Sequence, residues 1–495
     1  MDTFENFLNK TGEIGYVKRI SSSIVFCDGL PGVKLLEVVV FENGEIGQVF
    51  STGDNVVEII LLSRGYIRVG TKVARTGHTL KIMIGDNLFG NVVSPPDIVT
   101  FEEEETGSAR SIESDPPGID VRKNISKPFE TGVTIVDLML PLGMGQRELI
   151  IGDRKTNKTQ FILQSILTQA QKGGTVCVYA AIAKKRTDVI EFNKFLKENK
   201  IEDKVITIAS YPDDPSGIVY LTPYIAMTIA EYYRDKGYDV FVPLDDLTAH
   251  AKYYREISLL AGRFPGRNSY PGDIFYLHSR LLERAGNFQI SSGKGKLAEV
   301  SITCMPVAEM VMGDFSGYIQ TNLMAMTDGH LYFDRDYFNQ GKRPPINPFL
   351  SVTRVGRQAQ TPLLRELSRK LTSFMVSYEK MKEFMHFGAE LSEESQKMLM
   401  MGDKITSIFD QASVTSRPYA LSVFLYTAVW SGYWLEKDIN GLRLELKKLT
   451  TLYLKNSDFR KQVNDLITNS ASLSYLIESM KSSQANILQL LSQLK

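Results

Sequence analysis

Residues 146–170 read QRELIIGDRKTNKTQFILQSILTQA, and this stretch decides the fold of the middle of the chain. The run RELII is typical of a buried strand, and QFILQSILTQA has the spacing of a helix. The residues between them come close to the P-loop pattern, in which a Gly, four variable residues and Gly-Lys-Ser/Thr join a strand to a helix. Backbone N–H groups at such a helix start bind phosphate, and the helix dipole assists. The predicted loop comprises Gly152, Asp153, Arg154, Lys155, Thr156, Asn157, Lys158 and Thr159.

Three side chains of this loop decide how well it binds a nucleotide. We expect Lys158 to reach the β and γ phosphates of ATP or ADP, and the Thr159 hydroxyl to bind Mg²⁺. Asn157 stands where the pattern has its second Gly, a position that commonly needs a positive φ, and Asn tolerates that conformation best among ordinary residues. The extra side chain predicts weakened binding. The alternative is a helix start that merely carries Thr, Asn and Lys.

An acidic pair follows a later apolar run, in the segment DVFVPLDDLTAH at 239–250. A carboxylate at the end of a core strand beside a P-loop can hold the waters around Mg²⁺. The alternative is a helix N-cap, because Asp before a helical run also caps well. We assign Asp245 to the magnesium side and Asp246 to the cap. Pro243 is awkward in a central strand, since it has no N–H for pairing.

The pattern of the chain changes twice along its length. Residues 13–93 hold short Val- and Ile-rich runs such as SIVFCDGL, KLLEVVVFENG, NVVEIILL and TLKIMIGDN, which predict a small β-barrel or sandwich. The Pro pairs and acidic run between 94 and 116 suit a solvated linker. Apolar runs at 147–152, 175–181, 204–210 and 239–244 alternate with helical stretches and predict a parallel sheet covered by helices. Beyond about residue 360 the spacing is helical.

Composition narrows the possible functions. The 495 residues contain 57 Lys plus Arg and 57 Asp plus Glu, so the formal net charge is zero, which argues against a dedicated nucleic-acid or anionic-membrane binder. The cysteines Cys27, Cys177 and Cys304 are far apart and predict buried thiols in a reducing compartment. The longest apolar runs are too short to span a bilayer, so we expect membrane contact only through partners.

Longer stretches resemble the alpha subunit of F-type ATP synthases. The segment GQRELIIGDRKTNKT is similar to the family's GQRELIIGDRQTGKT. The segments PGRNSYPGDIFYLHSRLLERAG, GDFSGYIQTNLMAMTDG and GKRPPINPFLSVTRVGRQAQ follow in the family's order, so the similarity covers most of the chain. The resemblance implies a multidomain α/β protein with an N-terminal β-barrel (1–93), a RecA-like P-loop domain (94–359, with a linker at 94–126) and a C-terminal helical bundle (360–495).

The resemblance also implies partners. In the family, three alpha and three beta subunits alternate in a ring around a central gamma-type shaft, and the alpha subunits bind a nucleotide that they do not turn over. Catalysis takes place in the beta subunit and is completed by an arginine of its alpha neighbour, which corresponds here to Arg354 in SVTRVG. Ser351 lies in the same turn and is expected to position it. The alternative for Arg354 is a surface arginine in a structural salt bridge.

Further residues take their expected roles from the same resemblance. Catalytic beta subunits have a Glu just after the strand that follows the P-loop helix, and alpha subunits usually have Gln there. This chain has Lys184, and a charged ammonium cannot accept the proton of the attacking water, so its own site should not hydrolyse ATP. Arg343 and Pro344 match positions that flank the bound adenine, and Gln411 resembles a glutamine that reaches the base.

Several departures from the family pattern predict a diverged alpha subunit and favour an F-type-like complex that consumes ATP for mechanical work. Lys155 replaces the usual Gln, Ala325 replaces a Ser near the catalytic interface, and the N-terminal helical region that contacts the delta-type stator subunit is largely missing, which puts that contact in doubt. Three alternatives stay open. They are a stand-alone P-loop ATPase of the secretion type, a hexameric RNA translocase, and a structural subunit that has lost nucleotide binding.

Overall fold

The computed structural model describes residues 3–53, 55–101, 108–292, 296–386, 392–411, 415–434 and 436–492. Most of the predicted acidic run at 101–106 lies outside these residues. The chain divides into two compact units. The first comprises Met1–Asn124, Gly145–Ile151 and Ala170–Thr327, and the second comprises Ile125–Met144, Gly152–Gln169 and Asp328–Lys495.

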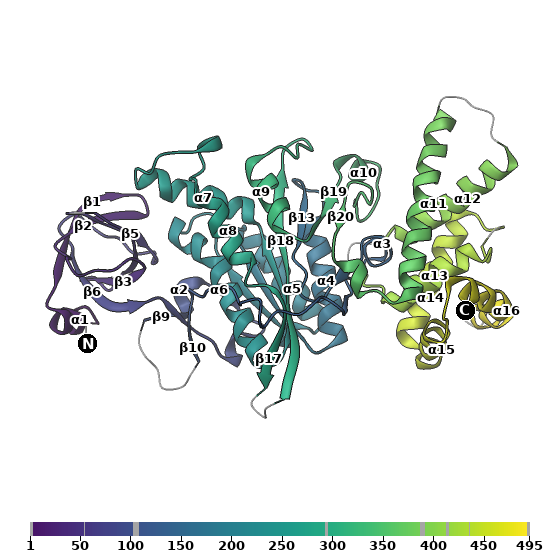
Figure 1. Ribbon diagram of the computed structural model, residues 1–495, viewed down its shortest axis with the longest axis horizontal. Coiled ribbons are helices and arrows are strands. Elements are labelled where there is room, and N and C mark those ends of the chain that lie inside the picture. Colours follow the sequence, from purple (N-terminus) through teal and green to yellow (C-terminus); the bar gives the residue numbers. More distant parts are fainter. Residues whose placement is uncertain are drawn as a thin grey trace. The chain divides into compact units, whose positions relative to one another are not determined.

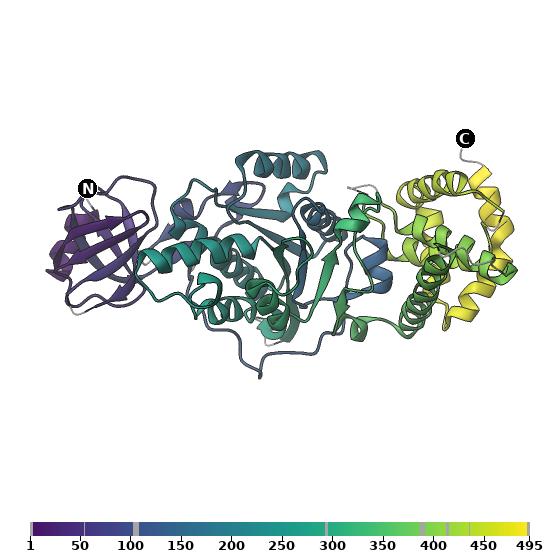
Figure 2. The same ribbon diagram turned by 90° about the horizontal axis from the view of Figure 1, so that it is seen from above.

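The first unit begins with a closed β-barrel, as the sequence predicts (Figure 1; Figure 2). The strands follow one another around it in the order β1, β2, β5, β4, β3 and β6, and neighbours are antiparallel. Their bounds are Ile14–Ser21 (β1), Ile24–Asp28 (β2), Glu37–Phe41 (β3), Ile46–Thr52 (β4), Val57–Leu61 (β5) and Lys72–Thr79 (β6). The alternating residues Val25, Cys27, Val39 and Ile59 belong to one buried apolar cluster. Helix α1 (Thr3–Thr11) packs against β6 and β3.

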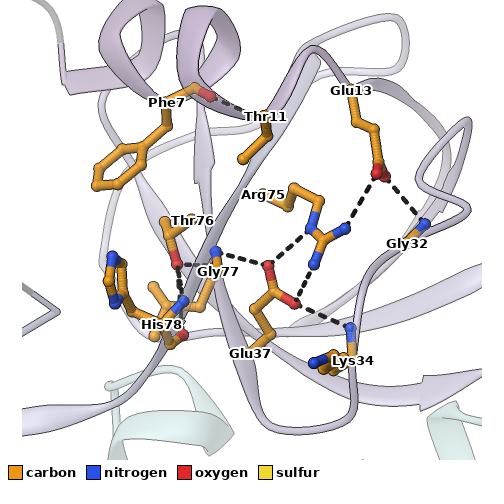
Figure 3. A network of polar contacts seen from close by, with 11 residues as sticks. Phe7, Thr11, Glu13, Gly32, Lys34, Glu37, Arg75, Thr76, Gly77 and His78 are labelled. Carbon is orange, nitrogen blue, oxygen red and sulfur yellow. Dashed lines mark hydrogen bonds and ion pairs between the residues drawn. The ribbon is translucent and has the colours of Figure 1, made fainter.

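A polar network joins β3 to β6 in this barrel (Figure 3). The Arg75 guanidinium donates to both carboxylate oxygens of Glu37, at 3.0 and 3.2 Å, and to Glu13 at 3.0 Å. The Glu37 carboxylate also accepts the backbone N–H groups of Lys34 (2.9 Å) and Gly77 (2.7 Å). Because Glu37 is only 3% exposed, these contacts compensate a carboxylate that has lost most of its water.

The chain that leaves the barrel is more ordered than a solvated linker. Strand β7 (Lys81–Met83), which lies in the segment TLKIMIGDN of the predicted barrel or sandwich, pairs instead with β9 (Val99–Thr100) and β10 (Ala109–Ser111). Helix α2 (Pro95–Ile98) begins with a capping box between Ser94 and Asp97 and buries Pro95 and Ile98. The apolar side chains of the Pro-rich segment therefore pack against protein, which its composition did not predict.

The main sheet of the first unit contains the strands that the apolar runs predict. In the unit the order is β13, β18, β16, β14, β15 and β8, and β16 pairs in parallel with both β14 and β18. The bounds are Glu148–Asp153 (β13), Thr175–Ala181 (β14), Val205–Ala209 (β15), Asp239–Asp245 (β16), Lys296–Met310 (β18) and Val92–Val93 (β8). Strand β17 (Gly286–Ser292) pairs antiparallel with β18 and makes the sheet mixed. Pro243 is accommodated inside β16, where it lies opposite Met305 of β18.

Helices cover this sheet. Helix α6 (Ser216–Asp235) is buried over most of its length and packs against β14, β16 and β18. Helix α5 (Arg186–Glu198) buries Val189, Phe192 and Leu196 on one face, and Phe192 stacks on Tyr179 of β14 with 4.2 Å between ring centroids. Helix α7 (Leu247–Leu260) packs against β18. The stacking of Phe192 on Tyr179 holds the tyrosine beside Asp245, the last residue of β16.

The second unit contains the P-loop and the helical domain. Helix α4 (Lys158–Lys172) follows the loop, and β19 (Gly329–Phe333) pairs antiparallel with β20 (Val352–Thr353). Helix α3 (Thr134–Met139) is buried throughout, and Phe161 of α4 contacts Phe333 edge-to-face at 5.7 Å.

The C-terminal part is helical, as predicted. The bounds are Pro362–His386 (α11), Glu393–Phe409 (α12), Tyr419–Trp430 (α13), Ile439–Lys455 (α14), Ser457–Thr468 (α15) and Leu473–Ser492 (α16). Figure 2 shows these helices gathered into one group, coloured green to yellow. Helix α13 is apolar all round and buried from Leu421 to Val429, which is typical of the central helix of a bundle. Among the described residues, no helix is both long enough and apolar enough to cross a bilayer.

Candidate functional site

The predicted phosphate loop curls at the start of α4. Lys155 and Asn157 both have positive φ, 61° and 64°, so the position of the missing second Gly does require the left-handed conformation that the sequence predicts. The Thr156 hydroxyl donates to the Asp153 carbonyl at 2.7 Å and closes the turn. Asn157 accepts the first helical bond, from the N–H of Phe161 at 3.2 Å. The loop therefore has a defined shape with Asn in place of Gly.

Lys158 and Gly152 hold the two ends of this loop. The Lys158 ammonium is buried and donates to the carbonyls of Gly152 (2.8 Å) and Asp153 (2.6 Å), so it lies under the loop. A Cβ on Gly152 would come within 2.4 Å of the Phe333 carbonyl, so only glycine fits there. The Arg335 guanidinium lies 4.0 Å from the Asp153 carboxylate. Strand β19 and the residues after it thus contact the loop directly.

The acidic pair Asp245-Asp246 divides its roles in part as predicted. Asp246 is the N-cap of α7, and its side chain accepts the backbone N–H of Ala249, which confirms the predicted cap. Asp245 is 1% exposed and is already paired, because the Lys184 ammonium lies 2.6 Å from one carboxylate oxygen and the Tyr179 hydroxyl donates to the other at 3.0 Å. Sequence reasoning missed Tyr179, although its place in β14, two residues before the strand ends, is a usable signal.

The carboxylates of Asp245 and Asp246 are buried, and the Lys184 ammonium lies beside them. Burial alone would lower the pKa of Lys184, but the carboxylates of Asp245 and Asp246 outweigh it and the pKa is raised. Burial raises the pKa of Asp246 to about 6, against the opposing effect of Lys184. The ammonium therefore stays charged at neutral pH and compensates the acidic pair.

The predicted magnesium residues belong to two elements, Thr159 to α4 and Asp245 to β16. Among the residues that the structure describes there is no group of three or more His, Cys, Asp and Glu side chains able to hold a metal. Of the two residues predicted on the magnesium side, Thr159 is the second residue of α4, and Asp245 has both carboxylate oxygens in contact with protein. The Asp245 carboxylate does not fit a magnesium role while Lys184 holds it.

A cavity of about 370 Å³ lies in the second unit. Arg343 and Pro344, the residues predicted beside adenine, both line it. The Arg343 guanidinium donates to the carbonyls of Phe338 (2.9 Å) and Lys342 (2.8 Å), which orders its own loop. The remaining lining residues include the aromatic and charged side chains Tyr337, Phe349, Phe409, Glu379 and Lys382. A flat ring with polar edges suits such a lining.

Gln411, which is predicted to reach the base, is held by backbone groups of its own chain. It is 1% exposed, and its amide oxygen accepts the N–H of Thr134 at 2.6 Å while its amide nitrogen donates to the carbonyls of Gly132 (2.9 Å) and Thr415 (3.0 Å). Its own N–H donates to the Arg343 carbonyl at 2.7 Å. Gln411 therefore ties the cavity loop to the start of α3. Residues 412–414 of the same segment lie outside the described residues.

Arg354 follows directly on β20, and its backbone is fixed. Its N–H donates to the Asp328 carbonyl at 3.1 Å, while its side chain is exposed. Ser351 is buried, accepts the N–H of Tyr332 (2.9 Å) and donates to the Asn347 carbonyl (2.6 Å), so it anchors the turn that leads to Arg354. Among the described parts of the chain, the Arg354 guanidinium has neither an ion-pair nor a hydrogen-bond partner. The salt-bridge alternative has no acidic partner here.

A curled P-loop at a helix start, preceded by a barrel and followed by a helical bundle, defines a P-loop nucleotide-binding class of protein. Comparison with known proteins makes this specific. Residues 132–353 match the nucleotide-binding domain of the ATP synthase alpha/beta family, and residues 360–485 match the C-terminal domain of the ATP synthase alpha/beta chain.

Full-length relatives agree with these matches. The chain is 36% identical to the ATP synthase subunit alpha of Neorickettsia sennetsu over 486 residues, which cover 96% of this chain and 94% of that protein. It is 39% identical to the ATP synthase subunit alpha of a Sulfurovum species over 424 residues, covering 85% and 83%. The chain belongs to the ATP synthase subunit alpha family.

Proposed function

We propose that this chain is the non-catalytic alpha-type subunit of an F-type or F-type-like rotary ATPase. It binds ATP or ADP at residues 152–159 without turning it over, and it supplies Arg354 to the catalytic site of a neighbouring beta-type subunit. Three such chains alternate with three beta subunits around a gamma-type shaft. The complex lies in the cytoplasm at the inner face of the membrane, held there by partner subunits, and takes part in ATP synthesis with ion transport or in ATP-driven mechanical work.

The exposed guanidinium of Arg354 carries this proposal. An arginine that stabilises charge on a phosphoryl group bound by another subunit must have an exposed side chain that extends away from its own chain. Its backbone must also be held in a defined position. Arg354 is exposed, its backbone is bonded to Asp328, and Ser351 anchors the turn before it. These features match a residue that acts on a partner, and they support the proposed arginine finger.

Lys184 supports the non-catalytic part of the proposal. A group that orients the attacking water must accept a hydrogen bond or a proton from it. The residue at this place is Lys184, and its ammonium is paired with Asp245 at 2.6 Å. Asn157 adopts the φ that the loop needs, and Lys158 can exchange its two carbonyl partners for phosphate oxygens. The loop thus keeps the parts needed for binding, while the hydrolytic part is replaced.

The adenine part of the proposed nucleotide site is the cavity lined by Arg343 and Pro344. The Gln411 N–H donates to the carbonyl of Arg343, which lines this cavity. Gln411 is proposed to support base binding by holding the loop that contains Arg343. Thr159 keeps the hydroxyl that Mg²⁺ would use, and Asp245 is the expected magnesium residue whose carboxylate is already ion-paired.

The test uses the chain alone, the beta-type partner alone and the assembled complex. ATP hydrolysis should require both chains, and Arg354→Lys should lower the turnover of the complex by roughly 10³-fold or more without changing its assembly, as for other arginine fingers. The matched control is Arg369→Lys, an exposed arginine on α11, which should keep full activity. Fast hydrolysis by the chain alone would support a stand-alone ATPase instead, and full activity of the Arg354→Lys complex would refute the proposed finger.

A further inference from the structure

The ion pair between Lys184 and Asp245 is buried and closes off a carboxylate. The ammonium lies 2.6 Å from one oxygen, the Tyr179 hydroxyl donates to the other at 3.0 Å, and Asp245 is 1% exposed. Charge-assisted contacts of this kind are strong in a dry environment. Both oxygens of the acid at the carboxyl end of β16 are therefore engaged by the protein itself.

The backbone holds Lys184 in place for this contact. Strands β14 and β16 run parallel with Ala181 opposite Asp245, and the N–H of Ile182 donates to the Asp245 carbonyl at 2.8 Å. On the other side, the N–H groups of Ala183 and Lys184 donate to Ser210, at 3.1 Å each. The three residues after β14 are thus bonded to the strands on both sides. The lysine side chain therefore starts from a fixed point of the backbone, and it is 23% exposed.

The Lys184 ammonium supplies to the Asp245 carboxylate the positive charge that a hydrated divalent ion would otherwise supply. Mg²⁺ binds in such sites through carboxylates that orient its water ligands, and those carboxylates need an oxygen that faces the ion. Asp245, Asp246 and Glu309 all act on Lys184 electrostatically, so one ammonium serves the whole acidic group. A divalent ion added beside a fixed ammonium would also meet like-charge repulsion.

We propose that Lys184 is a built-in cation that takes the place of Mg²⁺ at Asp245, so that this chain binds its nucleotide largely independently of Mg²⁺. The inference rests on the proposed function, in which the P-loop takes ATP or ADP and Asp245 is the acid on the magnesium side. It concerns the metal requirement of the bound nucleotide. Lys158 remains the residue that contacts phosphate, and Lys184 compensates the acid.

The first measurement is the affinity of the purified full-length chain for ADP and ATP, by calorimetry, with Mg²⁺ and with EDTA. The wild-type affinity should change by less than about threefold, which is under 1 kcal/mol. Lys184→Gln removes the charge and keeps the length, so Mg²⁺ should then raise the affinity by about tenfold or more. The control Lys185→Gln changes an exposed neighbour by the same charge and should behave as wild type.

The second measurement needs no nucleotide. Mg²⁺ alone should raise the thermal unfolding temperature of the Lys184→Gln chain, whose Asp245 has lost its cation, and should leave the wild type unchanged. A wild-type affinity that falls tenfold in EDTA would overturn the inference and leave the proposed nucleotide binding standing. Absence of ADP and ATP binding under both conditions would overturn the proposed function, and the Mg²⁺ effect on unfolding would then still decide the role of Lys184.

Discussion

Replacing Arg75 by Ala tests the polar network of the barrel. The substitution removes the guanidinium that bonds both oxygens of Glu37 and one of Glu13, and it leaves the two backbone N–H donors of Lys34 and Gly77 on Glu37. Glu37 is 3% exposed, so its charge stays in a dry site without a cation. We expect the barrel to lose stability while its backbone pairing remains intact.

The size of the stability loss in Arg75→Ala depends on the hydrogen bonds that Glu37 keeps. Removing one partner of a buried ion pair typically costs about 3–5 kcal/mol. The lower end, about 3 kcal/mol, applies here because two backbone N–H groups still compensate the carboxylate. The matched control is Lys72→Ala on the same strand, since Lys72 lies 3.9 Å from Glu42 and both side chains are exposed, at 49% and 40%. That exposed pair should be worth less than about 1 kcal/mol.

Hydrogen exchange of the full-length chain, read by mass spectrometry on peptides from the barrel, separates this effect from the other domains. A loss of about 3 kcal/mol corresponds to roughly a hundredfold faster exchange of the most protected barrel amides. Peptides from the helical domain should be unchanged. Equal exchange in the Arg75→Ala and Lys72→Ala chains would refute the reasoning, because burial would then have no weight.

Three further outcomes are expected. Asn157→Ala should lower ADP affinity or stability by about 1–2 kcal/mol, because Ala is strained at a φ of 64°, whereas Asn157→Gly should not, and equal effects of the two would contradict the strain argument. Gln411→Ala should lower the unfolding free energy by about 1–3 kcal/mol, since it leaves the buried Thr134 N–H without its partner, while the Gly132 carbonyl keeps the Gln164 amide and the Arg417 N–H. A pure loss of nucleotide affinity would argue for base contact instead. Burial lowers the pKa of His250 to about 4 and that of His278 well below its usual value. Between pH 6.5 and about 4 the unfolded chain therefore binds more protons than the folded chain, so the free energy of unfolding falls as the pH falls. The fall is at most about 1.4 kcal/mol per pH unit for each histidine. In urea titrations at several pH values, the double variant His250→Asn/His278→Asn should show a weaker dependence of this free energy on pH.

The regular parts of the fold could be predicted because local patterns determine them. Strand β14 coincides with the run TVCVYAA, since a strand buried on both faces is apolar at every position. Strand β16 was predicted in spite of Pro243, and the structure accommodates the proline opposite Met305. By contrast, β8 contains only Val92–Val93 and β7 leaves the barrel, because two or three residues carry no usable periodicity and their partners are chosen by the tertiary fold.

The features of the candidate site that local sequence determines were predicted. The contacts between residues far apart in the sequence were not. The positive φ of Asn157 and the cap at Asp246 follow from local chemistry, and the structure confirms both. The pairing of Lys184 with Asp245 joins the loop after β14 to the end of β16 and depends on the register of the two strands, so the sequence pattern alone could not predict it. Gln411 was assigned by resemblance alone, and its buried contacts with Thr134 and Gly132 join residues far apart in the sequence, so no local pattern predicts them.

The short strand β8 has a consequence for how the chain avoids aggregation. It pairs with β15 at the end of the sheet order in the first unit, where Thr207 and Ile208 lie opposite Val92 and Val93, and the N–H of Gly90 donates to the Val205 carbonyl at 3.0 Å. An uncovered β15 would offer its row of peptide groups to any other strand. The covering strand ends at Val93, and Pro95 follows two residues later at the start of α2 without an N–H to offer, so this edge presents few peptide groups to which another strand could add.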